Sequence, residues 1–495
     1  MKSSHSYKIL PGRNIRLLLL PAILILFSCN KLVSISDPTD RIVTNVAFST
    51  DDLAEAAVNG LYKTMMSTNY FSRGNATLYG ALSADELLLT YPLDPASVLY
   101  ENKIRITLAN GTGSAPTDHI WTSAYAVIYS ANAVIQGIAE SRSTQLQENV
   151  RKSLTAEAKC IRAFCYFYLT NYYDAVPLVL TTNYNAVISI ARSPKEAVYE
   201  QIIQDLLDAQ KDLPENFDAG KGKRVRVNKW AATALLARAY LYTKDYGKAA
   251  ANATLLIDNT ALFGLESDLN NVFLIESREA IWQMNQVISN DNQNPTPEGG
   301  MLLPNWATST DPLKGLMAYY LSPQLVSAFE PGDERRKQWV DSIELENITL
   351  LAHFSHKYKI GNYNMSYDPP IEYSMVLRLA EQYLIRAEAA ANGAAGGTAN
   401  AIADLNMIRH RAGLPDLPDD ITPAALEAAI AHEWQTEFFC EWGHRWFNLK
   451  RTGKAHNILS AISYKQPWAG DHQLLYPIPF EEIKLNNKLT QNTGY

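Results

Sequence analysis

The side chains with the most chemical potential lie near the C-terminus, in the stretch EWQTEFFCEWGHRWFNLKRTG from Glu433 to Gly453. Three carboxylates, a thiol, a histidine and two arginines are crowded together there. Such a set could bind a metal ion, could supply a thiol nucleophile with its base, or could serve the fold alone. The spacing of the residues decides among these alternatives.

Neither a metal site nor an activated thiol fits that spacing. His432-Glu433 would need a second histidine at position 436 for an HExxH zinc motif, and Thr436 stands there instead. Cys440 and His444 are spaced as an i,i+4 ligand pair, but two ligands do not make a zinc site and the chain has no CxxC motif. As a nucleophile and its base, the pair would need a reactive thiol, whereas a thiol inside an aromatic helix should have a raised pKa. We expect no metal, cofactor or catalytic residue here.

The same stretch fits an amphipathic helix that serves the fold. A helix over 424–450 would place Glu433, Glu437 and Glu441 on one face, and Arg445 would continue the row. A glutamate four residues before a basic residue is the favourable orientation for an exposed ion pair, worth a few tenths of a kcal/mol. A second row is apolar and consists of Trp434, Phe438 and Trp442. The sequence therefore predicts one helix with its charges compensated along its length.

The elements that position this helix are themselves expected to be helices in pairs. Arg-Ala occurs late in three amphipathic segments, at Arg162, Arg238 and Arg386. The second segment matches the tetratricopeptide pattern, in which small residues let paired helices approach closely. Further helices are expected at 51–67, 118–140, 147–171 and 195–213. The predicted fold class is mainly α, with a tetratricopeptide-like scaffold of helix pairs.

Two segments interrupt the scaffold, one from Asn69 to Thr117 and one from about 260 to 370. They contain Pro, Gly, Asn and Tyr with short apolar runs and no sustained helical period, so they are expected to be irregular loops with short strands. Binding residues concentrate on loops that a rigid frame holds, so these insertions are where we expect a ligand.

The N-terminus reads as an export signal. Four basic residues precede an apolar run from Leu17 to Phe27, which is shorter than the roughly 20 residues that span a bilayer. Leu26-Phe27-Ser28-Cys29 then resembles a bacterial lipobox, which predicts a signal peptide over 1–28 and acylation of Cys29 as a membrane anchor. The alternative is an ordinary cleaved signal with an incidental cysteine.

The net charge argues against one class of partner, and the cysteine content indicates how the cysteines are used. Loss of the four positive charges of residues 1–28 would take the formal net charge from −7 to −11. An acidic chain without a lysine and arginine cluster argues against nucleic acid as a partner. The remaining cysteines, Cys160, Cys165 and Cys440, are odd in number and are expected to be small buried hydrophobes.

Several motifs, taken in order, resemble the SusD/RagB family of outer-membrane nutrient-binding lipoproteins. After the lipobox they are FSTDDLAEAAVNGLY, YYDAVPLV, LSPQLVSAFEPGDERR, SMVLRLAEQYLIRAEAAAN, LNMIRHRAGL, EWGHRWFNLKRTG and LLYPIPFEEIKLNNKLTQNTGY. The resemblance covers 29–495, with an N-terminal part to about residue 230 and a C-terminal part from about 231. The chain departs from the family pattern at Trp434, Asn448 and Thr493.

This resemblance implies a cell-surface lipoprotein of the outer membrane that caps a TonB-dependent transporter of the SusC type. It would capture a glycan, deliver it to that transporter and catalyse nothing. The same role with peptide ligands is the first alternative. A glycoside hydrolase is a weaker one, because no motif nominates the two converging acids that it would need. A tetratricopeptide adaptor for protein tails is weaker still, since it would not need the two insertions.

A glycan site needs exposed aromatic rings for the apolar sugar faces and polar groups for the hydroxyls. Among the tryptophans, Trp230, Trp282, Trp434, Trp442 and Trp446 are expected to be buried, which leaves Trp121, Trp306, Trp339 and Trp468. Trp306 is favoured because its loop, GGMLLPNWATSTDPLKG, offers little to pack against. The remaining candidate ligand-binding residues are Tyr70, Tyr91, Tyr320 and Asp85, with Glu86 as a further acceptor.

Overall fold

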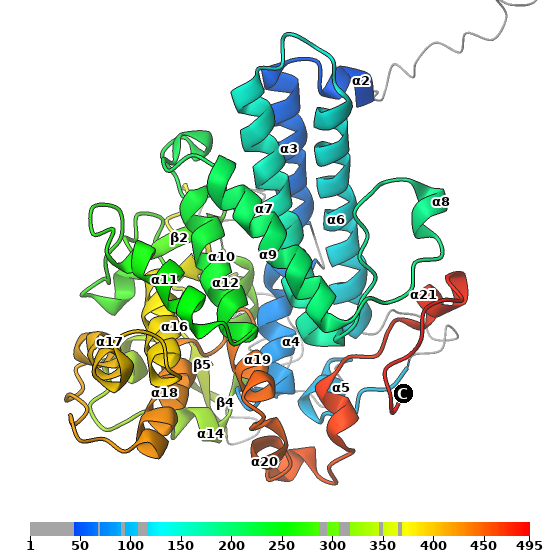
Figure 1. The fold of residues 1–495 in the computed structure, drawn as a ribbon. Helices are drawn as coiled ribbons and strands as arrows, with labels where there is room; N and C mark the ends of the chain where they lie inside the picture. The colour runs from blue at the N-terminus through cyan, green and yellow to red at the C-terminus, as the bar shows by residue number, and fades with distance from the viewer. Residues whose placement is uncertain are drawn as a thin grey trace, which may run out of the picture.

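The computed structural model describes residues 44–495 except for 68–69, 91–94, 107–115, 287–294, 306–316, 346–349 and 365–368. The described chain is mainly helical, as predicted (Figure 1). The predicted signal peptide and Cys29 lie outside the described residues.

The N-terminal half is a bundle of long helices that matches the periodicity of the sequence. Short helix α2 (Thr44–Ala47) leads into α3 (Asp51–Met65), where the Thr50 hydroxyl accepts from the backbone N–H of Leu53 and so caps the first turn. Figure 1 shows α3 beside α6 (Pro116–Glu140) and α7 (Glu148–Tyr173), and α9 (Lys195–Asp212) crosses below them. All four predicted helices are confirmed.

The C-terminal half contains the helix pairs. They are α10 (Lys229–Tyr242) with α11 (Tyr246–Ile257), and α16 (Leu379–Ala391) with α17 (Gly397–Arg411). Each repeated arginine bonds an acid on a neighbouring helix: Arg162 to Asp205 at 2.8 Å, Arg238 to Glu381 at 2.5 Å, and Arg386 to Asp404 at 2.7 Å. The repeated Arg-Ala motif therefore marks buried or half-buried ion pairs between helices.

The two insertions contribute three antiparallel ribbons. They are β1 (Leu87–Leu89) with β3 (Tyr319–Leu321), β2 (Ala280–Met284) with β6 (Ser374–Arg378), and β4 (Val340–Leu345) with β5 (Leu350–Ser355). Short strands in the second insertion were expected. The first insertion was expected to be irregular, yet it holds α4 (Ala76–Ser83), every residue of which is buried. Its sequence, ATLYGALS, is too short and too uniformly apolar for a helical period to stand out.

The remaining elements are short apart from the 15-residue helix over Pro423–Glu437. They are the π-turn η2 (Phe71–Asn75), α5 (Ser97–Tyr100), α8 (Tyr184–Val187), η3 (Asp218–Gly220), η4 (Leu269–Asn271), α12 (Pro297–Leu302), α14 (Pro323–Val326), α15 (Glu334–Gln338), α18 (Pro423–Glu437), α19 (His444–Arg451), α20 (Ala455–Leu459), η6 (Ser463–Lys465), η7 (Asp471–Leu474) and α21 (Phe480–Leu485).

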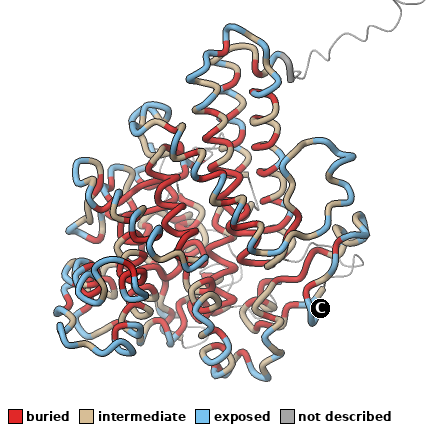
Figure 2. The backbone as a smooth tube through the Cα atoms, viewed as in Figure 1, coloured by how far each residue is buried: buried red, intermediate tan, exposed pale blue. Residues whose placement is uncertain are grey.

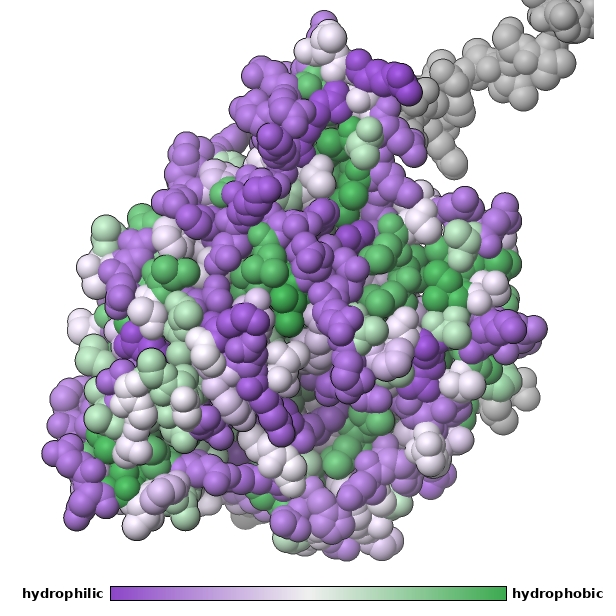
Figure 3. Space-filling model, in the orientation of Figure 1, coloured by the Kyte–Doolittle hydropathy of each residue, from purple (hydrophilic) through white to green (hydrophobic). Residues whose placement is uncertain are grey.

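One apolar core runs through both halves of the chain. Figure 2 shows the buried residues concentrated where the long helices meet the helix pairs and ribbons. Cys160, Cys165 and Cys440 are free and buried there, as expected. The face drawn in Figure 3 is mostly hydrophilic, with separate apolar areas. Among the described residues, none of the helices combines the length and the apolar character that a bilayer crossing demands.

The predicted single helix over 424–450 is wrong. Helix α18 ends at Glu437, and α19 begins at His444 after a tight turn. Cys440, Trp442 and Gly443 have φ values of +51°, +47° and +72°, the left-handed conformation that ends a helix. The turn also brings two backbones together, because a Cβ added at Gly80 in α4 would lie 2.4 Å from the Cα of Gly443. Reversal of the chain here moves α19 against α4 and the first insertion.

Candidate ligand-binding site

The acids of the C-terminal stretch form a buried ion-pair network that supports the candidate site. Glu437 is fully buried, and its carboxylate contacts the guanidinium groups of Arg335, Arg378 and Arg411. These arginines come from α15, β6 and α17, so one carboxylate joins three separate elements. The expectation of exposed ion pairs within one helix is wrong, because the partners are distant in sequence and the pairs exclude water.

The two neighbouring acids extend this network. Glu433 accepts from Arg335 at 2.7 Å and from Arg409 at 2.9 Å. Burial would raise the pKa of its carboxyl, but these cationic neighbours, Arg335 foremost, hold that pKa at about 2. Glu441 accepts from buried Lys357 at 2.5 Å and from Arg378 at 2.8 Å. The two acids thus join separate elements of the fold through buried ion pairs.

The thiol and imidazole of the stretch do not form an activated pair. Burial raises the pKa of the Cys440 thiol well above its usual value and lowers that of His444 well below. The His444 ring stacks on Trp434, with 5.6 Å between ring centres and 27° between ring planes. A thiol that keeps its proton and an imidazole that stays neutral offer neither a thiolate nor an imidazolium.

One group of possible metal ligands exists among the described residues, and an arginine already fills it. Glu330, His432 and Glu433 bring one ligand atom each within 4.8 Å of the others. The Arg409 guanidinium donates to Glu330 at 2.6 Å and to Glu433 at 2.9 Å. His432 Nε2 is bonded to the Ala328 carbonyl at 2.7 Å. The guanidinium supplies the positive charge that a metal ion would bring.

Arg445 connects helix α19 to the first insertion. The Arg445 guanidinium forms two parallel 2.8 Å hydrogen bonds to the Asp85 carboxylate, one of the predicted ligand acceptors. Asp85 is 3% exposed, so its two oxygens are engaged within the protein. Beside it, burial raises the pKa of Glu86 to about 8. Both acids lie directly before β1 and support the β1–β3 ribbon.

Three tyrosines gather beside this ribbon and form the candidate site, here called the tyrosine cluster: Tyr100, Tyr320 and Tyr464. The rings of Tyr100 and Tyr464 stack, with centres 4.5 Å apart and planes 8° from parallel. Tyr320, in β3 opposite Leu88, lies close enough to raise the pKa of both neighbours, although burial is the larger cause for each. All three rings are half-buried, so part of each side chain remains exposed.

The tyrosine cluster has a rigid base and one unused polar atom. Lys465 is fully buried and donates to the backbone carbonyls of Leu82, Ser83 and Tyr100 and to Asn102 Oδ1. This fixes the backbone on both sides of the stacked pair. The Tyr464 hydroxyl is buried and has no hydrogen-bond partner among the described residues. An unsatisfied buried hydroxyl is costly to the fold.

The predicted ligand residues fall into three sets. Trp306 and Tyr91 lie outside the described residues; in the sequence, Tyr91 comes shortly after β1 and Trp306 comes before β3. Tyr320 is in the cluster and Asp85 is beneath it. Tyr70 is half-buried at the start of η2 and packs against the main core.

The remaining tryptophans are also placed. The five expected in the core are buried. Trp121 and Trp339, which stayed open as platforms, are 2% and 0% exposed, so they are core residues. Sequence reasoning missed Tyr464, because SYKQPW lies far along the chain from both insertions and only the fold brings it to Tyr100. The feature of the sequence that could have indicated Tyr464 is its place in an irregular segment, close to Trp468, which is half-exposed in the structure.

Comparison with known proteins places this geometry in a family. Residues 348–495 match the model of the SusD family, and residues 96–241 match the family described as "Starch-binding associating with outer membrane". A SusD-like protein of Formosa agariphila is 25% identical over 514 residues, covering 96% of this chain and 98% of that protein. The starch-binding protein SusD of Bacteroides thetaiotaomicron is 33% identical over 129 residues, 24% of this chain and 21% of that one.

Solved structures show the same fold. A SusD superfamily protein from Bacteroides thetaiotaomicron has a TM-score of 0.74 at 24% identity, covering 90% of this chain and 99% of that one. A laminarin-binding SusD-like protein has a TM-score of 0.71 at 24% identity, covering 90% and 100%. The family models, the nearly full-length relatives and the shared fold agree, and the chain belongs to the SusD/RagB family.

Proposed function

We propose that this protein captures a glycan at the tyrosine cluster and passes it to a SusC-like TonB-dependent transporter of the outer membrane. A lipid on Cys29 holds it at that membrane, facing the cell exterior. It binds without catalysis and uses no cofactor.

The observation that carries this proposal is the stacked pair Tyr100–Tyr464 with Tyr320 beside it. Sugar rings present apolar C–H faces with hydroxyls at the rim, so they bind half-exposed aromatic rings that have polar atoms nearby. The cluster meets this need, since its rings are rigidly supported and the Tyr464 hydroxyl lacks a partner among the described residues.

The comparisons support a glycan as the ligand class. One family model describes starch binding in association with the outer membrane, and one related structure is that of a laminarin-binding protein. Tethering at the membrane would favour transfer, because it raises the effective concentration of bound ligand at a neighbouring transporter. Modest affinity is therefore sufficient.

The environment of the acids supports binding without hydrolysis. A glycosidase needs one protonated and one ionised carboxyl on either side of the scissile bond. Asp85 and Glu86 are adjacent acids, but they are 3% and 1% exposed, and the Asp85 carboxylate is already paired with Arg445. A peptide ligand is the alternative, since the same rings would pack against peptide side chains.

An affinity-electrophoresis screen of the purified protein tests the proposal. The gels would contain laminarin, starch and other polysaccharides, oligopeptides would be titrated in parallel, and product formation would be followed throughout. We expect retardation by a subset of polysaccharides without change in chain length. Shortened chains would show an enzyme, and binding of oligopeptides alone would show the alternative ligand class.

A further inference from the structure

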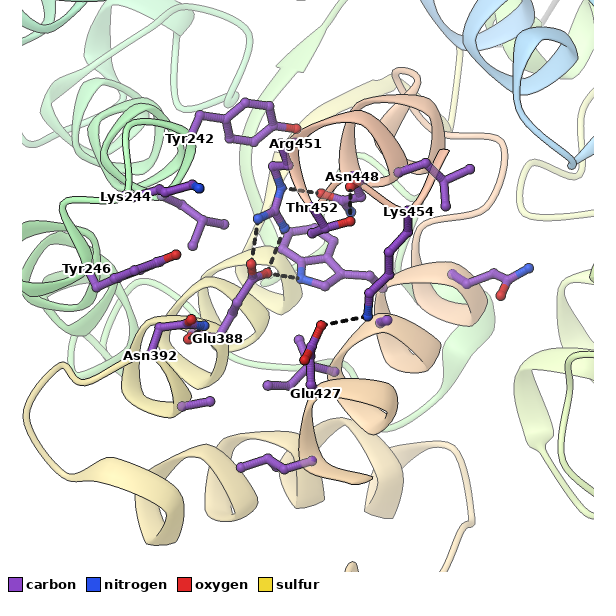
Figure 4. A pocket seen from close by; sticks show the side chains of 18 of the residues that line it. Tyr242, Lys244, Tyr246, Glu388, Asn392, Glu427, Asn448, Arg451, Thr452 and Lys454 are labelled. Carbon is purple, nitrogen blue, oxygen red and sulfur yellow. Dashed lines mark hydrogen bonds and ion pairs between the residues drawn. The ribbon is translucent and has the colours of Figure 1, made fainter. Parts of the chain in front are cut away.

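A cavity bounded by described residues lies away from the tyrosine cluster, between the helix pairs and α18–α19. Its volume is about 600 Å³, within the range of roughly 300–1,000 Å³ in which proteins bind compact ligands. Figure 4 shows Lys244, Tyr246 and Asn392 on one side, and Arg451, Lys454 and Glu427 on the other. Stacked helix pairs commonly bind extended segments on such concave surfaces.

The floor of this cavity is rigid and electrically balanced. The Arg451 guanidinium forms a two-bond pair with the Glu388 carboxylate, at 2.5 and 2.6 Å. Its Nε donates to Asn448 Oδ1 at 2.7 Å, and Trp434 Nε1 donates to Glu388 at 3.1 Å. Because these charges cancel, the floor supplies shape and hydrogen-bonding groups without net charge.

The rim differs from the floor, because one of its cations is uncompensated. Lys454 pairs with Glu427 at 2.7 Å. Lys244, in the turn between α10 and α11, has no carboxylate within 4.0 Å among the described residues. The cavity therefore presents one free ammonium group beside the Tyr246 ring and the Asn392 amide, which favours a ligand with a carboxylate.

The backbone at Lys244 is the second observation that marks this residue. Its φ is +61°, at the position after a helix end where glycine is preferred because a side chain strains this conformation. A lysine here directs its charge to the rim at a cost that glycine would avoid.

The walls favour a peptide over an acidic sugar. Helix α18 lines the cavity with aliphatic side chains, and α10, α19 and α20 add further ones: Pro423, Ala424, Leu426, Ile430, Ala431, Leu241, Leu449 and Ile458. The indole of Trp434 is 5% exposed and stacks on His444, so it offers no free face to a sugar ring. Aliphatic walls with amides at Asn392 and Gln435 suit the side chains and backbone of an extended chain.

We infer that this cavity is a second binding site, separate from the tyrosine cluster, which takes the C-terminal end of an extended aliphatic peptide. Lys244 pairs with the terminal carboxylate at the rim, and the peptide side chains lie against α18. The ligand is thus the C-terminal tail of a partner protein, recognised by its terminal charge.

Fluorescence anisotropy with a dye-labelled pentapeptide tests this inference on the full purified chain. The probe ends in Ala-Leu-Leu with a free carboxylate, and a second probe differs only by C-terminal amidation. We expect saturable binding of the free acid and at least tenfold weaker binding of the amide. Lys244→Gly should weaken binding of the free acid about tenfold without lowering thermal stability, because glycine suits the φ of this position.

Lys221→Gly is the matched control. Lys221 is also an exposed lysine with a positive φ, +54°, and it does not line the cavity. We expect this variant to bind the free-acid probe as the wild type does. Failure of the probe to bind at 1 mM, equal binding of the amide, or unchanged binding by Lys244→Gly would overturn the inference. Displacement of the probe by a digalacturonate as readily as by unlabelled peptide would overturn the peptide assignment.

Discussion

Replacement of Glu437 by glutamine tests whether the buried ion-pair network holds the insertions to the helix pairs. Glu437 is fully buried between Arg335, Arg378 and Arg411. Glutamine keeps the volume, so no cavity is created, but it removes the charge that three guanidinium groups share. Removal of one partner from a buried pair costs about 3–5 kcal/mol, and we expect a loss of unfolding free energy in this range at pH 7.

The pH dependence of that loss is a second signature. Burial would raise the pKa of Glu437, but Arg411, Arg378 and Arg335 hold it well below its usual value. A depressed carboxyl pKa stabilises the fold above the unfolded value of about 4.3, and this contribution is lost as the pH falls. The difference between wild type and Glu437→Gln should therefore be full at pH 7 and should shrink below about pH 4.

Urea unfolding followed by tryptophan fluorescence measures both quantities. Glu427→Gln is the control, because Glu427 is an exposed partner of Lys454 and a surface pair contributes about 0–1 kcal/mol. A loss below about 1 kcal/mol for Glu437→Gln, or a difference that stays constant down to pH 3, would refute the assignment of the network as a structural tie.

Two further predictions concern the elements around the cluster. Burial raises the Glu86 pKa to about 8, so its neutral form stabilises the fold below about pH 4.3, and this contribution is lost as the pH rises towards 8. Glu86→Gln should therefore flatten the dependence of unfolding free energy on pH between about 4.3 and 8, as measured by urea titrations. An unchanged slope in the variant would contradict the raised pKa. Gly80→Ala places a Cβ 2.4 Å from the Gly443 backbone and should cost about 1–3 kcal/mol in thermal unfolding. The control Gly60→Ala, with open space around its Cβ, should gain about 0.5–1 kcal/mol, and equal effects at both glycines would contradict the close packing.

The long helices and helix pairs could be predicted from the sequence because their signal is local. Apolar residues recur with the helical period through α3, α6, α7 and α9, and each is found close to its predicted bounds. The Arg-Ala motif also identified the helices that pair. The division of the chain at about residue 230 stays a prediction.

The turn between α18 and α19 could not be predicted because its cause is not local. The i,i+4 spacing of Glu433, Glu437 and Glu441 suggested one continuous helix. What breaks it is the competition of arginines from α15, β6 and α17 for the same carboxylates, together with the close approach of α4 to Gly443. Those partners are spread over the chain and come together only in the fold.

The candidate site was predictable in its region but only partly in its residues. Tyr320 was nominated and lies in the cluster, whereas Asp85 was nominated as a ligand acceptor and is found paired with Arg445. Tyr464 was missed because no local pattern connects it to Tyr100. Exposure of single aromatic residues depends on long-range packing, which also explains why Trp121 and Trp339 could not be assigned to the core in advance.

The most direct test of the proposed function is a calorimetric titration of the glycan that the screen selects into wild type, Tyr100→Ala and Tyr184→Ala. Tyr184 is 68% exposed on α8 and serves as the matched control. Because burial of a large apolar side chain is worth about 1.5–3 kcal/mol and alanine removes the ring that the sugar would cover, we expect Tyr100→Ala to weaken binding about tenfold or more. The control should bind as wild type does. Equal affinity in all three proteins would contradict the tyrosine cluster as the glycan site.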